Sequence, residues 1–341
     1  MATEVLVKVF RGDLIESIHR GHIAVVNANG ELLYSVGDPG EVIYARSSMK
    51  PLQAIPIVET GAAEHFNFDN ADLSLTCASH NGENQHTLRV QSILERADLS
   101  ISDLQCGTHN PRWEETYETL IKTGGQVTPV YNNCSGKHSG MLATAKHMNE
   151  STNNYYKLDH PVQKRIIEAI SELTEVPENE IKIGIDGCGV PVHGVPLLNL
   201  ALGFAKMADP RLLSNKRQEA VNKITTAMME APEMVGGTDR FCSDFMRILD
   251  GRMFGKAGAE GVYCIGDKET GIGIALKIED GNGRATSPVA VEVLTQLGLL
   301  SESQRAQLNA YHYPKLKNAR SEEIGELRPE FTLEHAQMHS L

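Results

Sequence analysis

The residues best suited to covalent chemistry lie in the segment 46–51, which reads Arg-Ser-Ser-Met-Lys-Pro and contains an S-x-x-K motif. A serine and a lysine three positions apart share one face of a helix. A lysine that is partly desolvated and has lost its proton can accept the hydroxyl proton, which makes the serine a nucleophile. Ser47 and Lys50 therefore indicate acyl transfer without a histidine base, although an isolated motif of this kind is more often an ordinary helix cap.

Two further short motifs carry complementary polar groups. Ser79-His80-Asn81 has the form S-x-N, and Lys256 lies between glycines in the segment 255–258. A second hydroxyl can relay a proton to a leaving amine, and an asparagine amide both donates and accepts hydrogen bonds. The lysine supplies positive charge where glycines let the backbone approach a ligand. Taken alone, the first motif is typical of an Asn-Gly turn and the second of an exposed loop.

The elements that must position these motifs read as strands at both ends of the sequence and helices in the middle. The patterns predict strands at 4–10, 22–27, 31–36, 73–78, 181–185, 261–266 and 271–278. They predict helices at 51–60, 84–97, 139–149, 161–174, 196–207, 214–230 and 288–299. This order predicts an α/β fold, an α+β sandwich with a mainly antiparallel sheet covered by helices. We expect one domain over residues 1–341, with a polar, peripheral tail after about residue 313.

Composition and charge exclude several kinds of partner. A formal net charge of -12 argues against nucleic acid, whose phosphates require clustered Lys and Arg. The sequence has no basic amphipathic segment and no apolar run long enough to cross a membrane. The N-terminal residues lack the pattern of a signal peptide, so we expect a cytoplasmic protein. The six cysteines are then expected to be thiols or ligands rather than disulfides.

Taken in order, the three short motifs resemble the catalytic plan of serine β-lactamases and penicillin-binding proteins. Ala257 stands where that family usually has Thr, and the spacing between the first two motifs is short. Longer segments give a more specific resemblance. The segments 46–53, 78–83, 130–141 and 184–191 are similar to the Rhizobium etli-type L-asparaginases, also called asparaginase II. The similarity extends from about residue 5 to about residue 310.

This resemblance implies a fold like that of serine β-lactamases and glutaminases, a homodimer, and hydrolysis of L-asparagine to L-aspartate and ammonia. It places the nucleophile at Ser47 and its base at Lys50. It also implies a second serine–lysine pair, formed by Ser79 and Lys256.

The resemblance further implies a metal site, usually zinc, bound by Cys134, Lys137 and Cys188. Two thiolates suit zinc, whereas a lysine ligand must first lose its proton. Cys134 and Lys137 fit one helical turn, and Cys188 must arrive from elsewhere. The alternative for the two cysteines is that they are small buried thiols of the core.

We assign the side chains of Arg46, His80, Asn81, His138 and Asp186 to substrate binding. Asp186 follows a strand and precedes a glycine turn, where its carboxylate could bind the α-amino group of an amino acid. Arg46 or His138 would face the α-carboxylate. The alternative for Asp186 is a turn aspartate that satisfies local amides.

The resulting hypothesis is an amidohydrolase that forms an aspartyl ester on Ser47. An assignment with Ser79 as nucleophile and Lys256 as base stays open. So does a glutaminase or another β-lactamase-like serine hydrolase, because one methylene changes binding by only about 1–3 kcal/mol. A non-enzymatic alternative is a zinc- or redox-sensing protein built on Cys134, Lys137 and Cys188.

Overall fold

The computed structural model describes residues 3–336, and these separate by their internal contacts into two compact units. The first unit combines the residues up to Ser48, the segment Val195–Asp209 and the residues from Gly255 onward. The second unit combines Met49–Gly194 and Pro210–Phe254. The expectation of a single domain stays a prediction.

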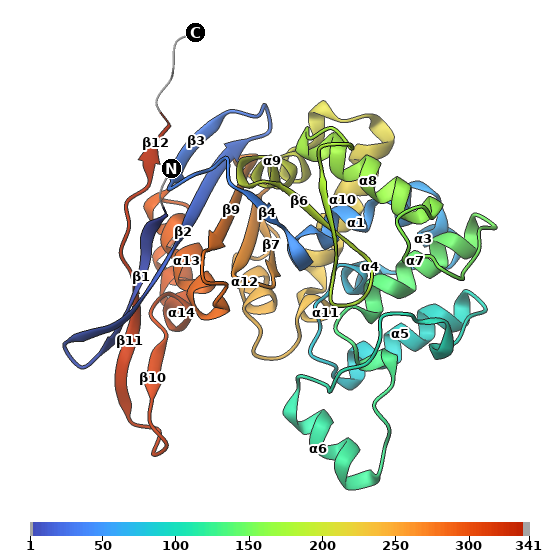
Figure 1. Cartoon of the computed structure of the whole chain (residues 1–341), viewed down its shortest axis with the longest axis horizontal. Helices are drawn as coiled ribbons and strands as arrows, with labels where there is room; N and C mark the ends of the chain where they lie inside the picture. The colour runs from blue at the N-terminus through green and yellow to red at the C-terminus, as the bar shows by residue number, and fades with distance from the viewer. Residues whose placement is uncertain (1–2, 337–341) are drawn as a thin grey trace. The chain divides into compact units, whose positions relative to one another are not determined.

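The first unit is built on an antiparallel sheet, which confirms the predicted sheet type (Figure 1). Its strands are β1 Glu4–Arg11, β2 Leu14–Asn27, β3 Leu32–Val36, β7 Met253–Gly258, β8 Val262–Asp267, β9 Ile272–Ile278, β10 Lys315–Lys317, β11 Glu323–Pro329 and β12 Glu334–His335. The order is β10-β11-β1-β2-β9-β8-β7, and β3 pairs with β2 and β12. The polar tail thus adds β10 and β11 to one edge. A short strand, β4 Val42–Tyr44, leads to the S-x-x-K segment.

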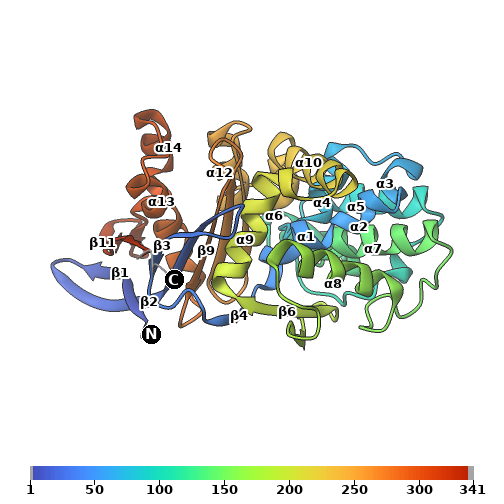
Figure 2. The ribbon, with the colours of Figure 1, turned by 90° about the horizontal axis from the view of Figure 1, so that it is seen from above.

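Helices cover both faces of this sheet, which confirms the predicted covering by helices (Figure 2). Helix α9, Leu197–Ala208, packs on β2, β8 and β9. Gly273 permits this close packing, because a Cβ there would lie 1.9 Å from the carbonyl oxygen of Ala201. On the other face, α13, Thr286–Gln296, packs on β1, β8, β9 and β11, and α14, Glu302–His312, packs against α13.

The second unit is mostly helical. Its α-helices are α1 Lys50–Gln53, α2 Ile55–Glu59, α3 Ala62–His65, α4 Asn70–Thr76, α5 Asn84–Arg96, α6 Glu114–Thr123, α7 Ser135–His147, α8 Pro161–Thr174, α10 Asn215–Glu230, α11 Pro232–Val235 and α12 Phe241–Leu249. Helix α10 packs against α2 and α4, and α7 packs against α4 and α5. Strands β5, Lys182–Ile185, and β6, Pro191–Pro196, form an antiparallel hairpin. Among residues 3–336, no helix is long and apolar enough to cross a membrane.

The strand predicted at 73–78 is wrong, because most of this segment lies in helix α4. The alternation Leu-Ser-Leu-Thr looks like a strand, but the helix is fixed by a capping box. The Asp69 side chain accepts from the Asp72 amide, and the Asp72 side chain accepts from the Asp69 amide. Ser74 and Thr76 are buried and donate to backbone carbonyls, which removes the cost of burying their hydroxyls.

Candidate active site

The turn that carries Ser47 follows β4 in the first unit. Residues Arg46–Met49 form a single 3₁₀ turn, and Lys50 then begins α1. Arg46 has a φ of 51°, in the left-handed region that non-glycine residues seldom adopt. Such backbone strain costs about 1–3 kcal/mol and is concentrated at functional sites. Ser47 is partly exposed, so its hydroxyl is accessible at the end of this strained turn.

The neighbouring hydroxyl, Ser48, has a different environment. It is fully buried, and its Oγ donates to the carbonyl oxygen of Ala45 at 2.7 Å. It is also hydrogen-bonded to the thiol of Cys264 on β8. Ser48 therefore stabilises the turn, and Ser47 is the more exposed of the two serines.

Strand β7 brings Lys256 to the same turn. Lys256 is fully buried, donates to the carbonyl oxygen of Ala257 at 2.8 Å, and acts electrostatically on Cys264. Gly258 lets the strand approach, because a Cβ there would lie 2.5 Å from the carbonyl oxygen of Ala45 and 3.3 Å from the amide of Ser48. The K-x-G segment is thus a buried strand that packs on the turn, rather than an exposed loop.

In the second unit, Lys50 contacts Ser79. Lys50 is fully buried, and its Nζ donates to the carbonyl oxygen of Ala78 and to Ser79 Oγ, the latter at 3.2 Å. Ser79 itself is held by its amide, which donates to the carbonyl oxygen of Val235 at 2.9 Å. The sequence paired Lys50 with Ser47 and Lys256 with Ser79. Each of those pairs joins residues of different units, so both pairings stay predictions.

His80 is occupied by protein partners at both ring nitrogens. The Gly82 amide donates to Nδ1 at 3.2 Å, so Nε2 carries the proton and donates to Ser135 Oγ at 2.8 Å. The Ser135 hydroxyl in turn donates to the carbonyl oxygen of Val130 at 2.9 Å. Burial, reinforced by the cationic form of His86, holds the pKa of His80 well below its usual value. A neutral ring with two protein partners gives the predicted substrate contact of His80 no support.

Asn81 is anchored on the loop that contains Gly236 and Thr238. The backbone N–H of Asn81 donates to the carbonyl oxygen of Gly236. The side-chain Nδ2 donates to the carbonyl oxygen of Thr238 at 3.3 Å. Its Oδ1 is buried and accepts no hydrogen bond from the described part of the protein. Asn81 therefore retains one acceptor for a ligand, as its predicted role requires.

The three predicted metal ligands lie together in the second unit. Cys134 precedes α7, Lys137 lies in its first turn, and Cys188 lies in the turn between β5 and β6. Lys137 Nζ donates to Cys188 Sγ at 3.2 Å. A hydrogen bond from the Cys134 thiol lowers the pKa of Cys188 to about 5. The same bond raises the pKa of Cys134 to about 12.

The donor set fits zinc with one condition. Two sulfur atoms and one nitrogen converge, and one sulfur is already a thiolate, as a zinc ligand must be. Burial lowers the pKa of Lys137, but the negative charge of the nearby Cys188 thiolate raises it by more, so a metal would have to displace a firmly held proton. Across residues 3–336, no group of three or more His, Cys, Asp or Glu could hold a metal, so a site here depends on Lys137.

His138 and Asp186 lie near this cluster. The Tyr155 hydroxyl accepts from the Gln105 amide and donates to His138 Nδ1 at 2.7 Å, which leaves the imidazole proton on Nε2. Burial, with a further contribution from Lys137, lowers the pKa of His138 to about 3. Nε2 is buried and has no partner among residues 3–336, so it is a neutral donor suited to an anionic or carbonyl oxygen. Asp186 accepts from the Gly187 amide at 2.9 Å, which agrees with the local-turn alternative.

Two groups received no role from the sequence. Glu83 accepts from the Thr238 amide at 2.7 Å and from the Thr238 hydroxyl at 3.2 Å. Burial raises the pKa of Glu83, but hydrogen bonds from the Thr238 backbone amide and from the side chains of Asn81 and Gln85 lower it by more. His193 on β6 is buried, and neither ring nitrogen has a partner among the described residues. Glu83 could have been found from the sequence, because it is the last residue of the family-like segment 78–83. No motif near His193 indicates a role for it.

The protein matches the L-asparaginase II family over residues 7–329. Among curated proteins, none matches it. Similar solved structures include a β-lactamase from Mycobacterium bovis, with 13% identity and a TM-score of 0.45 over 81% of this chain and 94% of that one. Another is D-alanine carboxypeptidase AmpC from Burkholderia cenocepacia, with 14% identity and a TM-score of 0.38 over 86% and 92%. A third is an octameric penicillin-binding protein homologue from Pyrococcus abyssi, with 15% identity and a TM-score of 0.34 over 82% and 73%.

The family match decides the class of protein, because it extends over nearly all of the 341 residues. It includes the turn with Ser47, the Lys50–Ser79 contact, the cysteine cluster and strand β7. The chain belongs to the L-asparaginase II family and is an asparaginase-type amidohydrolase.

Proposed function

We propose that this protein is an L-asparaginase of the Rhizobium etli type, which hydrolyses L-asparagine to L-aspartate and ammonia through an acyl-enzyme on Ser47. The observation that carries the mechanism is the hydrogen bond from buried Lys50 to Ser79 Oγ, at 3.2 Å. Serine–lysine catalysis needs a lysine held out of water next to a hydroxyl through which protons can pass. The family match supports the choice of a small amide as substrate.

In acylation, Lys50 in its neutral form accepts the Ser47 proton while Ser47 Oγ attacks the carbonyl carbon of the asparagine side-chain amide. The new C–O bond forms as the carbonyl electron pair moves onto oxygen, where backbone N–H groups stabilise it. Collapse then breaks the C–N bond. Lys50 returns its proton to Ser79 Oγ as Ser79 gives its own proton to the leaving nitrogen, so ammonia departs and both groups regain their starting states. Lys256 supplies positive charge that favours this proton transfer.

In deacylation, water attacks the aspartyl ester and its proton returns through the same groups. The ester C–O bond breaks, Ser47 regains its proton, and L-aspartate leaves. Arg46 and the Nε2–H of His138 are the proposed donors to the substrate α-carboxylate, and Asp186 is the proposed acceptor from the α-amino group. Asn81 Oδ1, which lacks a partner among the described residues, accepts from the substrate amide.

Zinc, when bound, would be held by Cys134, Lys137 and Cys188 and would supply a Lewis acid that polarises a substrate oxygen. The position of the metal would be set by these side chains, because Lys137 and Cys188 are already in contact without it. A homodimer remains part of the proposal. Light scattering on the purified protein would test it by giving twice the protomer mass of 37.3 kDa.

The decisive experiment measures ammonia release from asparagine and glutamine by the wild type and by Ser47→Ala. We expect Ser47→Ala to lose at least about a thousandfold in kcat. Ser48→Ala is the matched comparison, because it removes a hydroxyl that supports the turn through Ala45, and it should lose at most about tenfold in kcat, far less than Ser47→Ala. We expect glutamine to be the poorer substrate by kcat/KM.

A second assignment has its own support, because Lys50 contacts Ser79 directly. In that alternative Ser79 is the nucleophile, and the contact favours Lys50 as its base in place of Lys256, which the sequence analysis paired with it. The two assignments can be separated by quenching the enzyme during turnover of asparagine and locating the acylated serine by peptide mass mapping. An aspartyl adduct on Ser79, with Ser47→Ala still active, would overturn the assignment of Ser47.

A further inference from the structure

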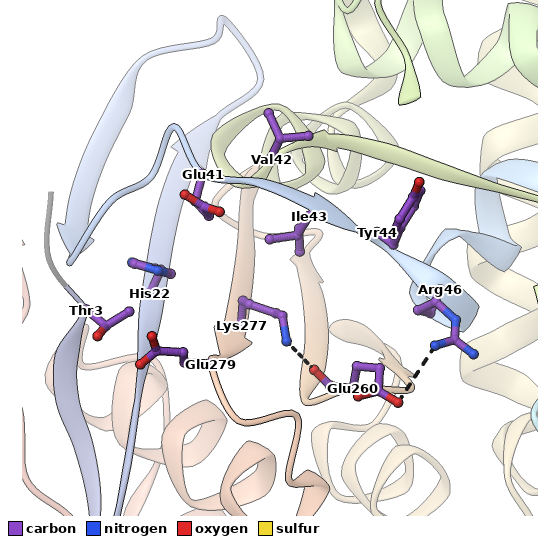
Figure 3. A pocket seen from close by; sticks show the side chains of 10 residues that line it. All are labelled: Thr3, His22, Glu41, Val42, Ile43, Tyr44, Arg46, Glu260, Lys277 and Glu279. Atoms are coloured by element: carbon purple, nitrogen blue, oxygen red, sulfur yellow. Dashed lines mark hydrogen bonds and ion pairs between the residues drawn. The ribbon is translucent and has the colours of Figure 1, made fainter. Parts of the chain in front are cut away.

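A groove in the first unit begins beside the turn that carries Ser47. Its volume is about 740 Å³, within the range of about 300–1,000 Å³ that is typical of sites for drug-sized ligands. Its walls come from β4, β2 and β9, and from the turn that contains Glu260 (Figure 3). A free amino acid would fill only a small part of this space.

The end of the groove nearest Ser47 carries positive charge. Arg46, which directly precedes Ser47, lies 3.9 Å from Glu260 Oε1 and keeps its side chain 25% exposed. Lys277 Nζ is fixed by donating to the carbonyl oxygens of Glu260 and Ile278, at 2.6 and 2.7 Å. This end therefore places two cations, Arg46 and Lys277, against the single carboxylate of Glu260, and the net positive charge favours a carboxylate.

The other end carries two exposed carboxylates, Glu41 and Glu279, on either side of His22 (Figure 3). The His22 ring accepts from the Asp38 amide at Nδ1, which leaves a proton on Nε2. Burial lowers the pKa of His22, so it adds little positive charge to oppose the carboxylates. This end suits an ammonium group.

Between the two ends, β4 supplies an apolar wall. Ile43 points from β4 toward Lys277, whereas Val42 and Tyr44 alternate to the other side of the strand and are 49% and 45% exposed (Figure 3). An apolar side chain bound here would pack against Ile43. The groove thus presents a carboxylate site, an apolar wall and an ammonium site.

We propose that the groove binds short peptides that end in asparagine, with the residue before the asparagine lying along β4. This inference rests on the proposed function, since it places the asparagine α-carboxylate at Arg46 and its side-chain amide at Ser47. The N-terminal ammonium group then pairs with Glu41 and Glu279. The chemistry is unchanged: the C–N bond of the asparagine side-chain amide breaks, water supplies the oxygen, and the peptide leaves with a C-terminal aspartate and ammonia.

The test compares L-asparagine, Leu-Asn and N-acetyl-Leu-Asn by ammonia release. The variants are Glu41→Gln/Glu279→Gln and the control Glu302→Gln, an exposed carboxylate at the start of α14. We expect Leu-Asn to be deamidated. In the double variant, the kcat/KM for Leu-Asn relative to asparagine should fall about tenfold, as expected when a charge-assisted pair is lost. For the wild type, kcat/KM for N-acetyl-Leu-Asn should be lower than that for Leu-Asn by a similar factor, because acetylation removes the ammonium charge. In the double variant, acetylation should cause no further loss.

Two results would overturn the inference. One is that Leu-Asn neither releases ammonia nor competes with asparagine. The other is that the double variant leaves the ratio at the value of the Glu302→Gln control. If asparagine itself gives no ammonia, the proposed function fails separately, and the Leu-Asn result still decides the groove.

Discussion

Replacing Gly258 with alanine tests whether β7 holds the turn that carries Ser47. The added Cβ would lie 2.5 Å from the carbonyl oxygen of Ala45, whereas real Cβ atoms essentially never come within 3.0 Å of another heavy atom. The strand and the turn must therefore separate by at least about 0.5 Å, the difference between these distances. The amide of Ser48, at 3.3 Å, limits movement in another direction.

We expect effects of similar size on catalysis and on folding, because a tenfold change in rate corresponds to about 1.4 kcal/mol. Overpacking of this kind costs about 1–3 kcal/mol of unfolding free energy. A misplacement of about 1 Å at a reacting group costs about a hundredfold in rate, so half of that displacement predicts roughly a tenfold loss in kcat/KM. We expect Gly258→Ala to show this loss on asparagine together with a Tm lower by several degrees.

The matched control is Gly283→Ala, because a Cβ at Gly283 meets no atom within 4 Å and its φ is not left-handed. The assays are ammonia release at several asparagine concentrations and thermal unfolding of the same samples. If Gly258→Ala keeps the kcat/KM of the control, close packing of β7 does not position the turn. That result would refute the reasoning even if the Tm fell.

Three further outcomes follow from buried groups. Burial, aided by Lys137, lowers the pKa of His193 to about 4, so the unfolded protein binds more protons below its usual pKa of 6.5. Stability should therefore be full above pH 6.5 and fall by about 2 kcal/mol by pH 5; urea unfolding should show a shallower fall for His193→Gln. Asp72→Asn should lower the free energy of unfolding, measured in urea, by about 2 kcal/mol, because the Asp72 carboxylate is only 2% exposed and pairs with two arginines. Asp98→Asn is the control and should change it little, because the Asp98 side chain is 97% exposed. Metal analysis should find about one zinc per protomer in the wild type and almost none in Cys188→Ser.

Much of the fold could be predicted because its signals are local. The hairpin of β8 and β9 and the turn at Gly30 lie where the patterns placed them. Helix α4 was missed because a seven-residue helix with alternating side chains resembles a strand over so short a length. The capping residues Asp69 and Asp72 were the available signal.

The sequence supplies candidate site residues, but it does not supply most of the contacts that these residues make in the structure. Cys134 and Lys137 are close in sequence, and the fold brings Cys188 to them as expected. The contact between Lys50 and Ser79 depends on how α1 meets the segment after α4, which no local pattern records. The occupied ring of His80 depends likewise on Ser135, far along the sequence.

The discontinuity of the first unit has a consequence for synthesis. Its sheet pairs Gly21 with Ile278 and Val7 with Pro329, so it closes only after the segment through β11 has left the ribosome. Pairing over such sequence separations is slow because a long loop must be closed first. Ser47 is therefore made early but gains its supporting strand β7 late. A nascent polypeptide that stops short of β9 carries Ser47 without the complete sheet on which its turn packs.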